Sequence, residues 1–216
     1  AKGKKAKAAN ASATAVDAPA PGAALAPWER DGRKWHVEER TSRNGRPVRW
    51  DGRILAHVVD RIEALAAEAG RSLAPTDWSQ RSLVRILHAG PGGETEIPFF
   101  QATTAGEWVV TLRFRVPRNT FQDKVLKAKL ALAAFHEGPT PVLSDAPRIK
   151  FASLPGCQEV TFAMHVLADV QTPAFEDFLA RAVQALERWC ASEPAPEAAT
   201  KTSRGRSRLK TAADLA

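Results

Sequence analysis

Apolar residues in the middle of this chain recur at two different spacings, which predict both helices and strands. Between residues 51 and 69 they lie three and four positions apart, as on one face of an α-helix. Asp51 is a suitable N-cap for this predicted helix, and Gly70 is a suitable residue to end it. The residues expected on its buried face are Ile54, Leu55, Val58, Ile62, Leu65 and Ala66.

Two later segments show the same helical spacing. After Pro117, Thr120 and Asp123 form a capping-box pattern that predicts a helix start. Thr172 followed by Pro173 predicts the start of the last helix, because proline is favoured at the first helical position. The expected buried residues are Phe121, Val125, Leu126, Leu130 and Leu132 in the first of these helices and Phe175, Phe178, Leu179, Ala182, Val183, Leu186 and Trp189 in the second.

Alternating apolar and polar residues predict the strands. A turn at Thr104-Ala105-Gly106 joins two of them as a hairpin, and residues 109–126 and 159–179 both read as strand, connection and helix. We therefore predict an α+β domain: an antiparallel sheet of about five or six strands with three helices on one face, in which two pseudo-repeated strand–helix units are suggested. The predicted strands are 34–42, 81–88, 95–103, 108–116, 148–154 and 159–166.

The two ends of the chain differ in composition from this patterned region. Residues 1–27 and 191–216 are rich in Ala, basic residues and Pro, and they lack apolar periodicity. We expect a disordered basic linker and a disordered basic tail around an α+β domain at 28–190. No apolar run is long enough to span a membrane, and the two cysteines do not form a disulfide framework. These features favour a cytoplasmic protein with no membrane partner.

The formal net charge of +7 is unevenly distributed. Residues 28–190 contain 22 Lys and Arg against 20 Asp and Glu, whereas residues 40–53 alone contain five Arg against one carboxylate. Because arginine binds DNA phosphates and an aromatic ring can stack on a base, this segment predicts a nucleic-acid interface. Its expected contact residues are Arg43, Arg46, Arg49, Trp50 and Arg53, grouped around an Asn44-Gly45 turn.

Two arginines of the fourth predicted strand extend this interface. If the alternate apolar residues of that strand face the core, Arg113 and Arg115 lie on the opposite face of the sheet. Arg85 and Lys150 would add positive charge if they lie on the same face. The alternative stays open that this is an ordinary solvated surface and that Trp50 packs on the core. We expect the other five tryptophans to pack in the core or at the domain edge.

The patterns that accompany catalysis are missing from the sequence. The glycine-rich stretch 90–93 lacks the lysine and hydroxyl residues of a phosphate-binding loop, and the five histidines show no metal-ligand spacing. Adjacent carboxylates such as Glu38 and Glu39 point to different sides of a strand or helix. We therefore predict no catalytic residues, no metal site and no cofactor.

Four blocks of sequence carry a resemblance to a known family. They are NGRPVRWDGRIL, TDWSQRSLVRI, WVVTLRFRVPRNTFQDKVL and QEVTFAMHVLADVQTPAFEDFL. In their order and spacing they resemble the C-terminal extension of the long, duplicated UvrA-like excinuclease proteins of some bacteria. The resemblance covers roughly residues 33–190 and implies a role in nucleotide excision repair, in which an ATPase recognises damaged DNA.

This sequence departs from the working core of that family, because it has no Walker A lysine loop, no ABC signature and no CxxC zinc module. No catalytic or nucleotide-binding residue is therefore carried over. The resemblance implies a non-catalytic accessory domain that binds DNA beside a parent ATPase or other repair subunits. The alternative is a protein–protein docking module, in which an exposed Trp50 and apolar sheet edges contact another repair protein.

Overall fold

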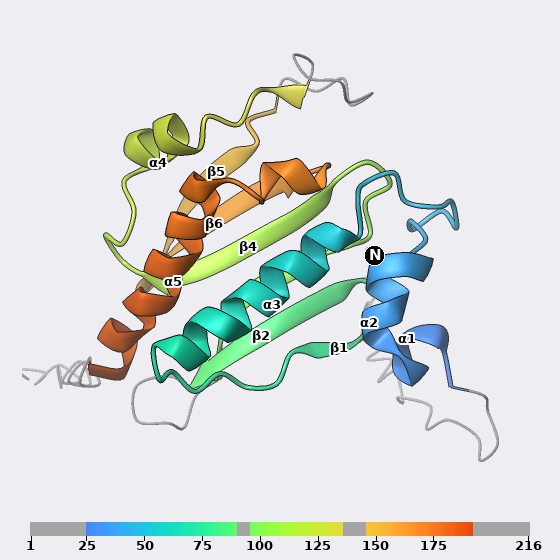
Figure 1. Ribbon diagram of the computed structural model, residues 1–216, viewed down its shortest axis with the longest axis horizontal. Coiled ribbons are helices and arrows are strands. Elements are labelled where there is room, and N and C mark those ends of the chain that lie inside the picture. Colours follow the sequence, from blue (N-terminus) through green and yellow to red (C-terminus); the bar gives the residue numbers. More distant parts are fainter. Residues whose placement is uncertain (1–24, 90–95, 136–145, 192–216) are drawn as a thin grey trace, which may run out of the picture.

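The computed structural model describes residues 25–89, 96–135 and 146–191. Within these ranges the chain forms a six-stranded antiparallel sheet with the strand order β1-β2-β3-β4-β6-β5. Helices pack on this sheet, so the predicted α+β class is confirmed (Figure 1). The strands are β1 Asp77–Gln80, β2 Leu83–Ala89, β3 Glu96–Thr103, β4 Val110–Pro117, β5 Ile149–Leu154 and β6 Cys157–Met164.

Two long helices, α3 (Arg53–Glu68) and α5 (Pro173–Ala191), lie side by side over one face of the sheet (Figure 1). The shorter α4 (Asp123–Leu130) contacts α5. The two strand–helix units suggested by the sequence correspond to β4–α4 and β6–α5, whose helices have 8 and 19 residues. Further helical turns, which the sequence patterns did not predict, are α1 Pro27–Arg30, α2 Gly32–Lys34, the π-helical turn η1 Trp35–Glu39 and the 3-10 turn η3 Leu167–Asp169.

Helix α3 buries the face that its spacing predicted. All six expected residues are buried, and Val59 joins them. The helix ends in a Schellman motif, in which the Arg71 N–H donates to the Ala66 oxygen at 2.7 Å and the Gly70 N–H donates to the Ala67 oxygen at 3.1 Å. Gly70 has a φ of +63°, which costs little in a residue without a Cβ.

The start of α5 is also as predicted. Thr172 Oγ1 accepts a hydrogen bond from the Phe175 N–H at 3.1 Å, and a proline occupies the first helical position. Further along the helix, the Phe178 ring lies 5.0 Å from Phe114 of β4 and 4.9 Å from Phe162 of β6, measured between ring centroids. This buried aromatic cluster joins α5 to the two central strands.

Strand β4 shows the predicted alternation, because its four apolar side chains are fully buried while Arg113 is exposed. In β3, a register shift after the Ile86↔Phe100 pair directs both Phe99 and Phe100 into the core. Pairing between β3 and β4 begins at Phe100↔Phe114. The first half of β3 is therefore not paired with β4, and the sheet opens at this end.

The predicted strand at 34–42 is wrong, because α2 and η1 occupy this segment. The Asp31 side chain caps the helical segment by accepting a backbone N–H at 2.9 Å. His36 and Arg40 lie one helical turn apart, and both contact Thr104 at the end of β3. These buried polar contacts need helical spacing, and they outweigh the local alternation of the sequence.

Helix α4 starts later than predicted and buries less. Thr120 does not cap it, because its hydroxyl donates to a backbone oxygen of the preceding turn at 2.6 Å, and the N-cap is Gln122. Val125, which was expected to be buried, is 56% exposed, whereas Leu126 and Leu130 are buried. A helix of only eight residues offers the core a narrow apolar stripe.

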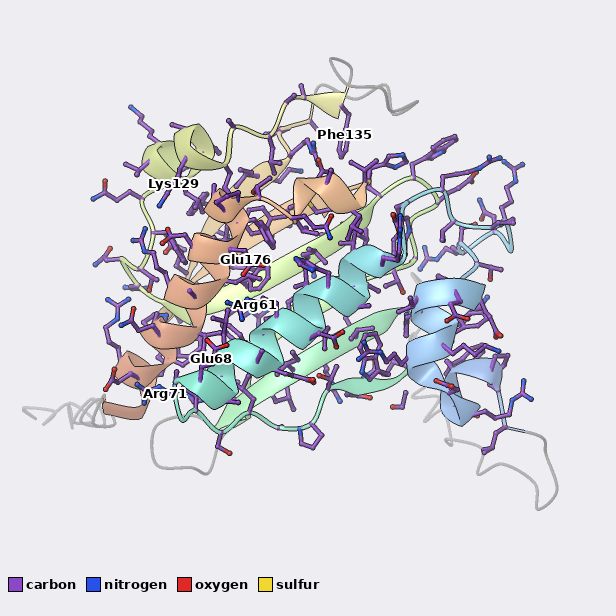
Figure 2. The ribbon with its side chains drawn as sticks, viewed as in Figure 1. Arg61, Glu68, Arg71, Lys129, Phe135 and Glu176 are labelled. Carbon is purple, nitrogen blue, oxygen red and sulfur yellow. The ribbon has the colours of Figure 1, made fainter. Side chains whose placement is uncertain are left out.

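Ion pairs join the helices on their outer surface. Arg61 of α3 donates to Glu176 of α5 at 2.6 Å (Figure 2). Lys129 of α4 reaches Asp177 of α5 at 2.6 Å, and Arg71 reaches a glutamate of α5 at 2.9 Å. These cations of the helical layer are therefore neutralised by neighbouring carboxylates.

Some of the sequence predictions concern residues outside the described ranges. The two tails that were predicted to be disordered lie there almost entirely, as does the glycine stretch 90–93. Among the helices of the described residues, none combines the length and apolarity needed to cross a membrane.

Candidate nucleic-acid interface

The segment richest in arginine forms a tight loop, residues 41–50, which we call the arginine loop. An isolated β-bridge closes its base, and the Gly45 N–H donates to the Ser42 oxygen at 3.0 Å. Gly45 has a φ of +73°, the left-handed conformation found in three-residue hairpin loops. The turn predicted at Asn44-Gly45 is therefore present.

The arginine loop is attached to the connection between β3 and β4, residues 104–109. The Arg43 N–H donates to the Ala105 oxygen at 3.2 Å, and the Arg49 N–H donates to the Glu107 oxygen at 2.6 Å. Gly106 sits between these acceptors, where an added Cβ would lie only 2.5 Å from a backbone oxygen. Backbone hydrogen bonds therefore fix the position of the loop on the end of the sheet.

The three arginine side chains of the loop, Arg43, Arg46 and Arg49, are exposed. Arg46 is 73% exposed, and its carboxylate neighbour Glu107 is 4.0 Å away, a distance at which a surface ion pair contributes little. For Arg43 and Arg49, the described part of the chain provides no ion-pair partner. The loop therefore keeps most of its positive charge.

The expectation that Trp50 is an exposed stacking residue is wrong. Trp50 is 3% exposed, and its Nε1–H donates to the Gly106 oxygen at 3.0 Å. The ring belongs to the hydrophobic core. A tryptophan whose N–H finds an acceptor gains more from burial of its ring than from contact with solvent.

A different aromatic residue, Trp108, is exposed at this end of the sheet. Its side chain is 37% exposed, and the Arg49 guanidinium carbon lies 5.6 Å from the centroid of its ring. Sequence reasoning expected Trp108 to pack in the core or at the domain edge and not to serve as a stacking platform. The alternation of the strand carries no signal for its exposure, because Trp108 precedes the first paired residue of β4, Val110.

Arg53 is exposed but already paired. Its guanidinium lies 2.6 Å from the Asp51 carboxylate, and these hydrogen bonds hold the pKa of Asp51 below its usual value. The N-cap of α3 is Gly52 and not the predicted Asp51, although Asp51 accepts the Arg53 N–H at 3.0 Å. Position 52 requires glycine, because a Cβ there would lie 1.9 Å from the Val37 oxygen.

Buried polar residues hold the β3 end of the connection, and we call His36, Arg40 and Thr104 the Thr104 anchor. Arg40 Nε donates to both Thr104 oxygens at 2.9 Å. His36 Nδ1 lies 3.1 Å from Thr104 Oγ1, and Nε2 lies 2.8 Å from the Gln80 carbonyl oxygen. Because a carbonyl only accepts, Nε2 carries the proton and Nδ1 accepts the threonine hydroxyl. Burial lowers the pKa of His36 to about 4, so the ring is neutral at pH 7.

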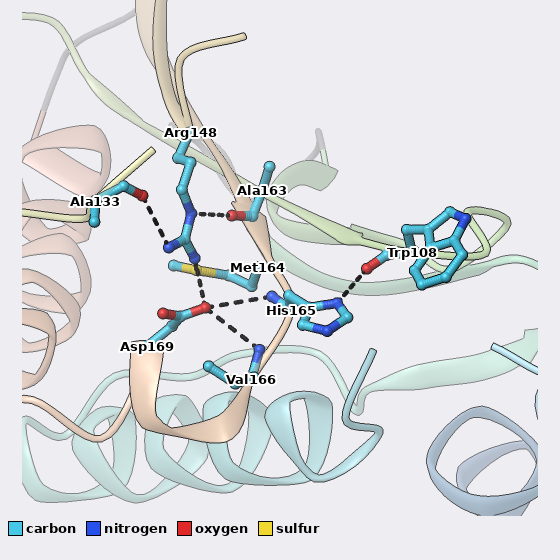
Figure 3. A network of polar contacts seen from close by, with 8 residues as sticks. All are labelled: Trp108, Ala133, Arg148, Ala163, Met164, His165, Val166 and Asp169. Carbon is cyan, nitrogen blue, oxygen red and sulfur yellow. Dashed lines mark hydrogen bonds and ion pairs between the residues drawn. The ribbon is translucent and has the colours of Figure 1, made fainter. Parts of the chain in front are cut away.

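A second buried network, the Trp108 anchor, consists of Arg148, His165 and Asp169 and holds the β4 end of the connection (Figure 3). His165 Nδ1 donates to the Trp108 backbone oxygen. The Asp169 carboxylate accepts the His165 N–H at 3.3 Å and forms an ion pair with Arg148. The His165 oxygen accepts the Asp51 N–H at 2.9 Å, which links this network to the start of α3.

On the sheet face opposite α3 and α5, one row of side chains crosses all six strands. The strand register aligns Asp77, Arg85, Gln101, Arg113, Thr161 and Lys150. Arg85 pairs with Asp77 at 2.9 Å, and in the next row Arg115 pairs with Glu159 at 3.0 Å. Arg113 and Lys150 are exposed without an ion-pair partner in the ranges described. The predicted common face exists, but half of its four cations are neutralised.

The arginine loop and this open face are neighbouring regions and not a single cluster. Arg113 follows Trp108 by five residues, about 16 Å at a strand rise of ~3.3 Å per residue. That span is shorter than one turn of duplex DNA, about 34 Å. The structure thus brings Arg43, Arg46 and Arg49 together at the end of the sheet and leaves Arg113 further along β4.

A cleft of about 670 Å³ opens at the other end of β4, where β3 is no longer paired with it. Ile97, Leu154 and Trp189 give it an apolar lining, to which Arg115 and Cys157 add polar atoms. Burial raises the pKa of the Cys157 thiol, so it is not held as a nucleophilic thiolate. The cleft is a second surface, separate from the arginine loop.

Within the ranges described, no group of three or more His, Cys, Asp or Glu side chains is arranged to hold a metal ion. Comparisons with protein-family models, with curated proteins and with solved structures find no match to this chain. Its function must therefore be inferred from the residues themselves.

Proposed function

We propose that this chain is a non-catalytic DNA-binding domain whose arginine loop contacts DNA phosphates. The observation that carries this proposal is the exposure of Arg43, Arg46 and Arg49 on a backbone that is hydrogen-bonded to the sheet. Cations of the helical layer, such as Arg61 and Lys129, are instead paired with carboxylates. A fixed cluster of arginines with spare charge supplies affinity for phosphate without sequence specificity.

The other predicted contact residues contribute unequally in this proposal. Arg113 has its charge available and lies within reach of a strand that leaves the loop along β4. Arg53 and Arg115 are neutralised by Asp51 and Glu159, so their contributions are smaller. Trp50 is buried and makes no contact with DNA.

The wider role that we propose is that of a cytoplasmic accessory domain of a UvrA-like ATPase in nucleotide excision repair. The order and spacing of the four sequence blocks support this role, and a DNA-binding surface is consistent with it. The parent ATPase or other repair subunits would hydrolyse ATP. This domain would raise the local affinity of the assembly for DNA.

The test is DNA binding by the full chain, measured by fluorescence anisotropy at about 50 and 200 mM salt. The variant Arg43→Ala/Arg46→Ala/Arg49→Ala removes the loop charges. The matched control Lys124→Ala/Lys127→Ala/Lys129→Ala removes the same charge from α4. We expect the loop variant to bind more weakly, and the slope of log K against log salt to fall in magnitude by about 3, as for three lost phosphate contacts.

The control separates a site from a general effect of charge. Equal losses of affinity in the two variants would mean that net charge alone attracts DNA. Unchanged binding by the loop variant would contradict the proposal directly, because the arginine loop would then make no contact.

The alternative function, docking of another repair protein, is favoured by the apolar cleft beside Leu154 and not by Trp50, which is buried. An apolar docking surface should respond little to salt. Binding of a repair protein that persists at high salt and is lost in Leu154→Arg would support this function. Salt-sensitive DNA binding that depends on the arginine loop would favour the first.

A further inference from the structure

The aromatic ring of Trp108 lies beside the loop arginines, and phosphate binding alone does not explain its presence there. Trp108 is the most exposed aromatic side chain in the part of the chain that the structure describes, at 37%. A single exposed apolar residue is common on protein surfaces and needs no explanation by itself. Here, however, the ring is flanked by Arg49, whose guanidinium carbon is 5.6 Å from the ring centroid.

The Trp108 anchor fixes the backbone of Trp108 through a hydrogen bond to its carbonyl oxygen. The His165 ring donates to this oxygen, and Asp169, which is paired with Arg148, accepts the backbone N–H of His165 (Figure 3). The Arg148 and Asp169 side chains are only 8% and 13% exposed, so this support is buried. In Figure 3 the indole extends away from the network. A ring that projects outwards from a fixed backbone loses little conformational entropy when it binds a flat partner.

We infer that Trp108 stacks on an unpaired DNA base, while Arg43 and Arg46 contact the phosphates next to that base. The inference rests on the proposed function, because it adds a strand preference to the same site. Bases within a duplex present only their edges in the grooves, whereas an unpaired base presents its flat face. Trp108 together with the arginine loop therefore selects single-stranded or locally opened DNA over closed duplex.

Arg49 has a defined place in this arrangement. Its planar guanidinium already lies over one face of the indole, so a base would stack on the opposite face. A base that reaches Trp108 meets a ring and a cation together, a combination that binds any base irrespective of sequence. The domain would thus recognise the opening of a duplex and not the bases within it.

The experiment compares a labelled single strand of about 15 nucleotides with the same strand in a duplex, using the full chain. Wild-type protein should bind the single strand more tightly. Trp108→Ala should weaken single-strand binding by about 5- to 150-fold, as expected for one lost base stack, and leave duplex binding unchanged. Trp108→Phe keeps a stacking ring, so it should retain most of the affinity while losing the quenching of tryptophan fluorescence by DNA.

Each other outcome has a distinct meaning. If Trp108→Ala weakens binding of both DNAs equally, or of neither, the stacking inference is overturned. The proposed phosphate contact survives that result as long as Arg43→Ala/Arg46→Ala/Arg49→Ala loses affinity for both DNAs. If this arginine variant binds both DNAs like the wild type, the proposed function itself fails. Thermal unfolding identifies a misfolded Trp108→Ala variant, and the fluorescence and affinity of Trp108→Phe then decide the matter.

Discussion

The connection that carries the arginine loop is held at each end by a buried arginine, and the two arginines differ in how their charge is balanced. Arg148, at the β4 end, forms an ion pair with Asp169. Arg40, at the β3 end, is 4% exposed and has no carboxylate partner within the described ranges. It donates instead to Thr104, and its guanidinium carbon lies 5.5 Å from the centroid of the Trp35 ring.

This difference determines what each arginine contributes to stability. Removing one partner of a buried ion pair strands the other charge, so the Arg148 side of the connection is sensitive to mutation. For Arg40, by contrast, the desolvation cost of burying a charge without a carboxylate partner in the described ranges already lowers the stability of the native state. Burial lowers the pKa of Arg40 to about 10, and its delocalised, weakly hydrated guanidinium stays charged at pH 7. One end of the connection is thus fixed by charge pairing and the other by hydrogen bonds and an aromatic face.

Breaking the ion pair should have the largest effect. Asp169→Asn leaves Arg148 buried without a counter-charge and weakens the hydrogen bond to His165, so we expect a loss of about 3–5 kcal/mol in the free energy of unfolding. Urea denaturation measures this loss. The control Asp60→Asn breaks an exposed pair with Arg33 and should cost at most about 1 kcal/mol. Similar losses in the two variants would contradict the proposed difference between the pairs.

The next largest effect should be a pH dependence that comes from the other anchor. Burial lowers the pKa of His36 from 6.5 to about 4, so the unfolded chain binds this proton more readily than the folded chain between those values. The stability contributed by neutral His36 is therefore complete above pH 6.5 and falls by about 3 kcal/mol as the pH drops to 4. His88, whose pKa is also lowered by burial, adds a slope of the same sign.

Urea midpoints between pH 7 and pH 4 measure this dependence. His36→Gln carries no titratable group, so its stability should vary less with pH than that of the wild type. An unchanged pH slope in this variant would show that His36 does not titrate in the expected window.

The parts of the fold that could be predicted are those whose signal lies within one segment. The apolar stripe of α3 and the Thr172 cap of α5 each follow from residues a few positions apart. The segment 34–42 was misassigned because its conformation depends on Thr104, more than 60 residues away, which His36 and Arg40 both contact. No local pattern reports such a contact.

The candidate site divides in the same way. Arg43, Arg46 and Arg49 could be recognised as a cluster because they are close in sequence, and their exposure agrees with that prediction. The sequence could not show that Trp50 is buried and that Trp108 is the exposed ring. Trp50 is buried against the backbone of the β3–β4 connection, and Trp108 is held by a histidine 57 residues further along the chain. The identity of the exposed ring therefore depends on tertiary contacts.

Replacing each buried arginine, Arg148 and Arg40, with methionine tests the difference between them by the same substitution. Arg148→Met leaves the Asp169 carboxylate without its counter-charge. Arg40→Met removes a charge that has no carboxylate partner among the described residues, and it leaves Thr104 with one donor fewer. We expect Arg40→Met to destabilise the protein by at least about 2 kcal/mol less than Arg148→Met does. Urea denaturation of the two variants under identical conditions gives the difference. A larger loss for Arg40→Met would mean that its hydrogen bonds matter more than the buried ion pair.

The smallest expected effect concerns paired and unpaired arginines on the surface. Arg53 is neutralised by Asp51, whereas Arg49 is not paired with a carboxylate in the described structure. The charge-neutral double variant Asp51→Asn/Arg53→Gln should therefore leave DNA affinity and its salt dependence unchanged. Arg49→Gln should reduce the magnitude of the salt slope by about 1, the value for one lost phosphate contact. If the double variant loses more affinity than Arg49→Gln does, the bound DNA contacts the start of α3, where the Arg53 guanidinium would exchange its carboxylate for a phosphate.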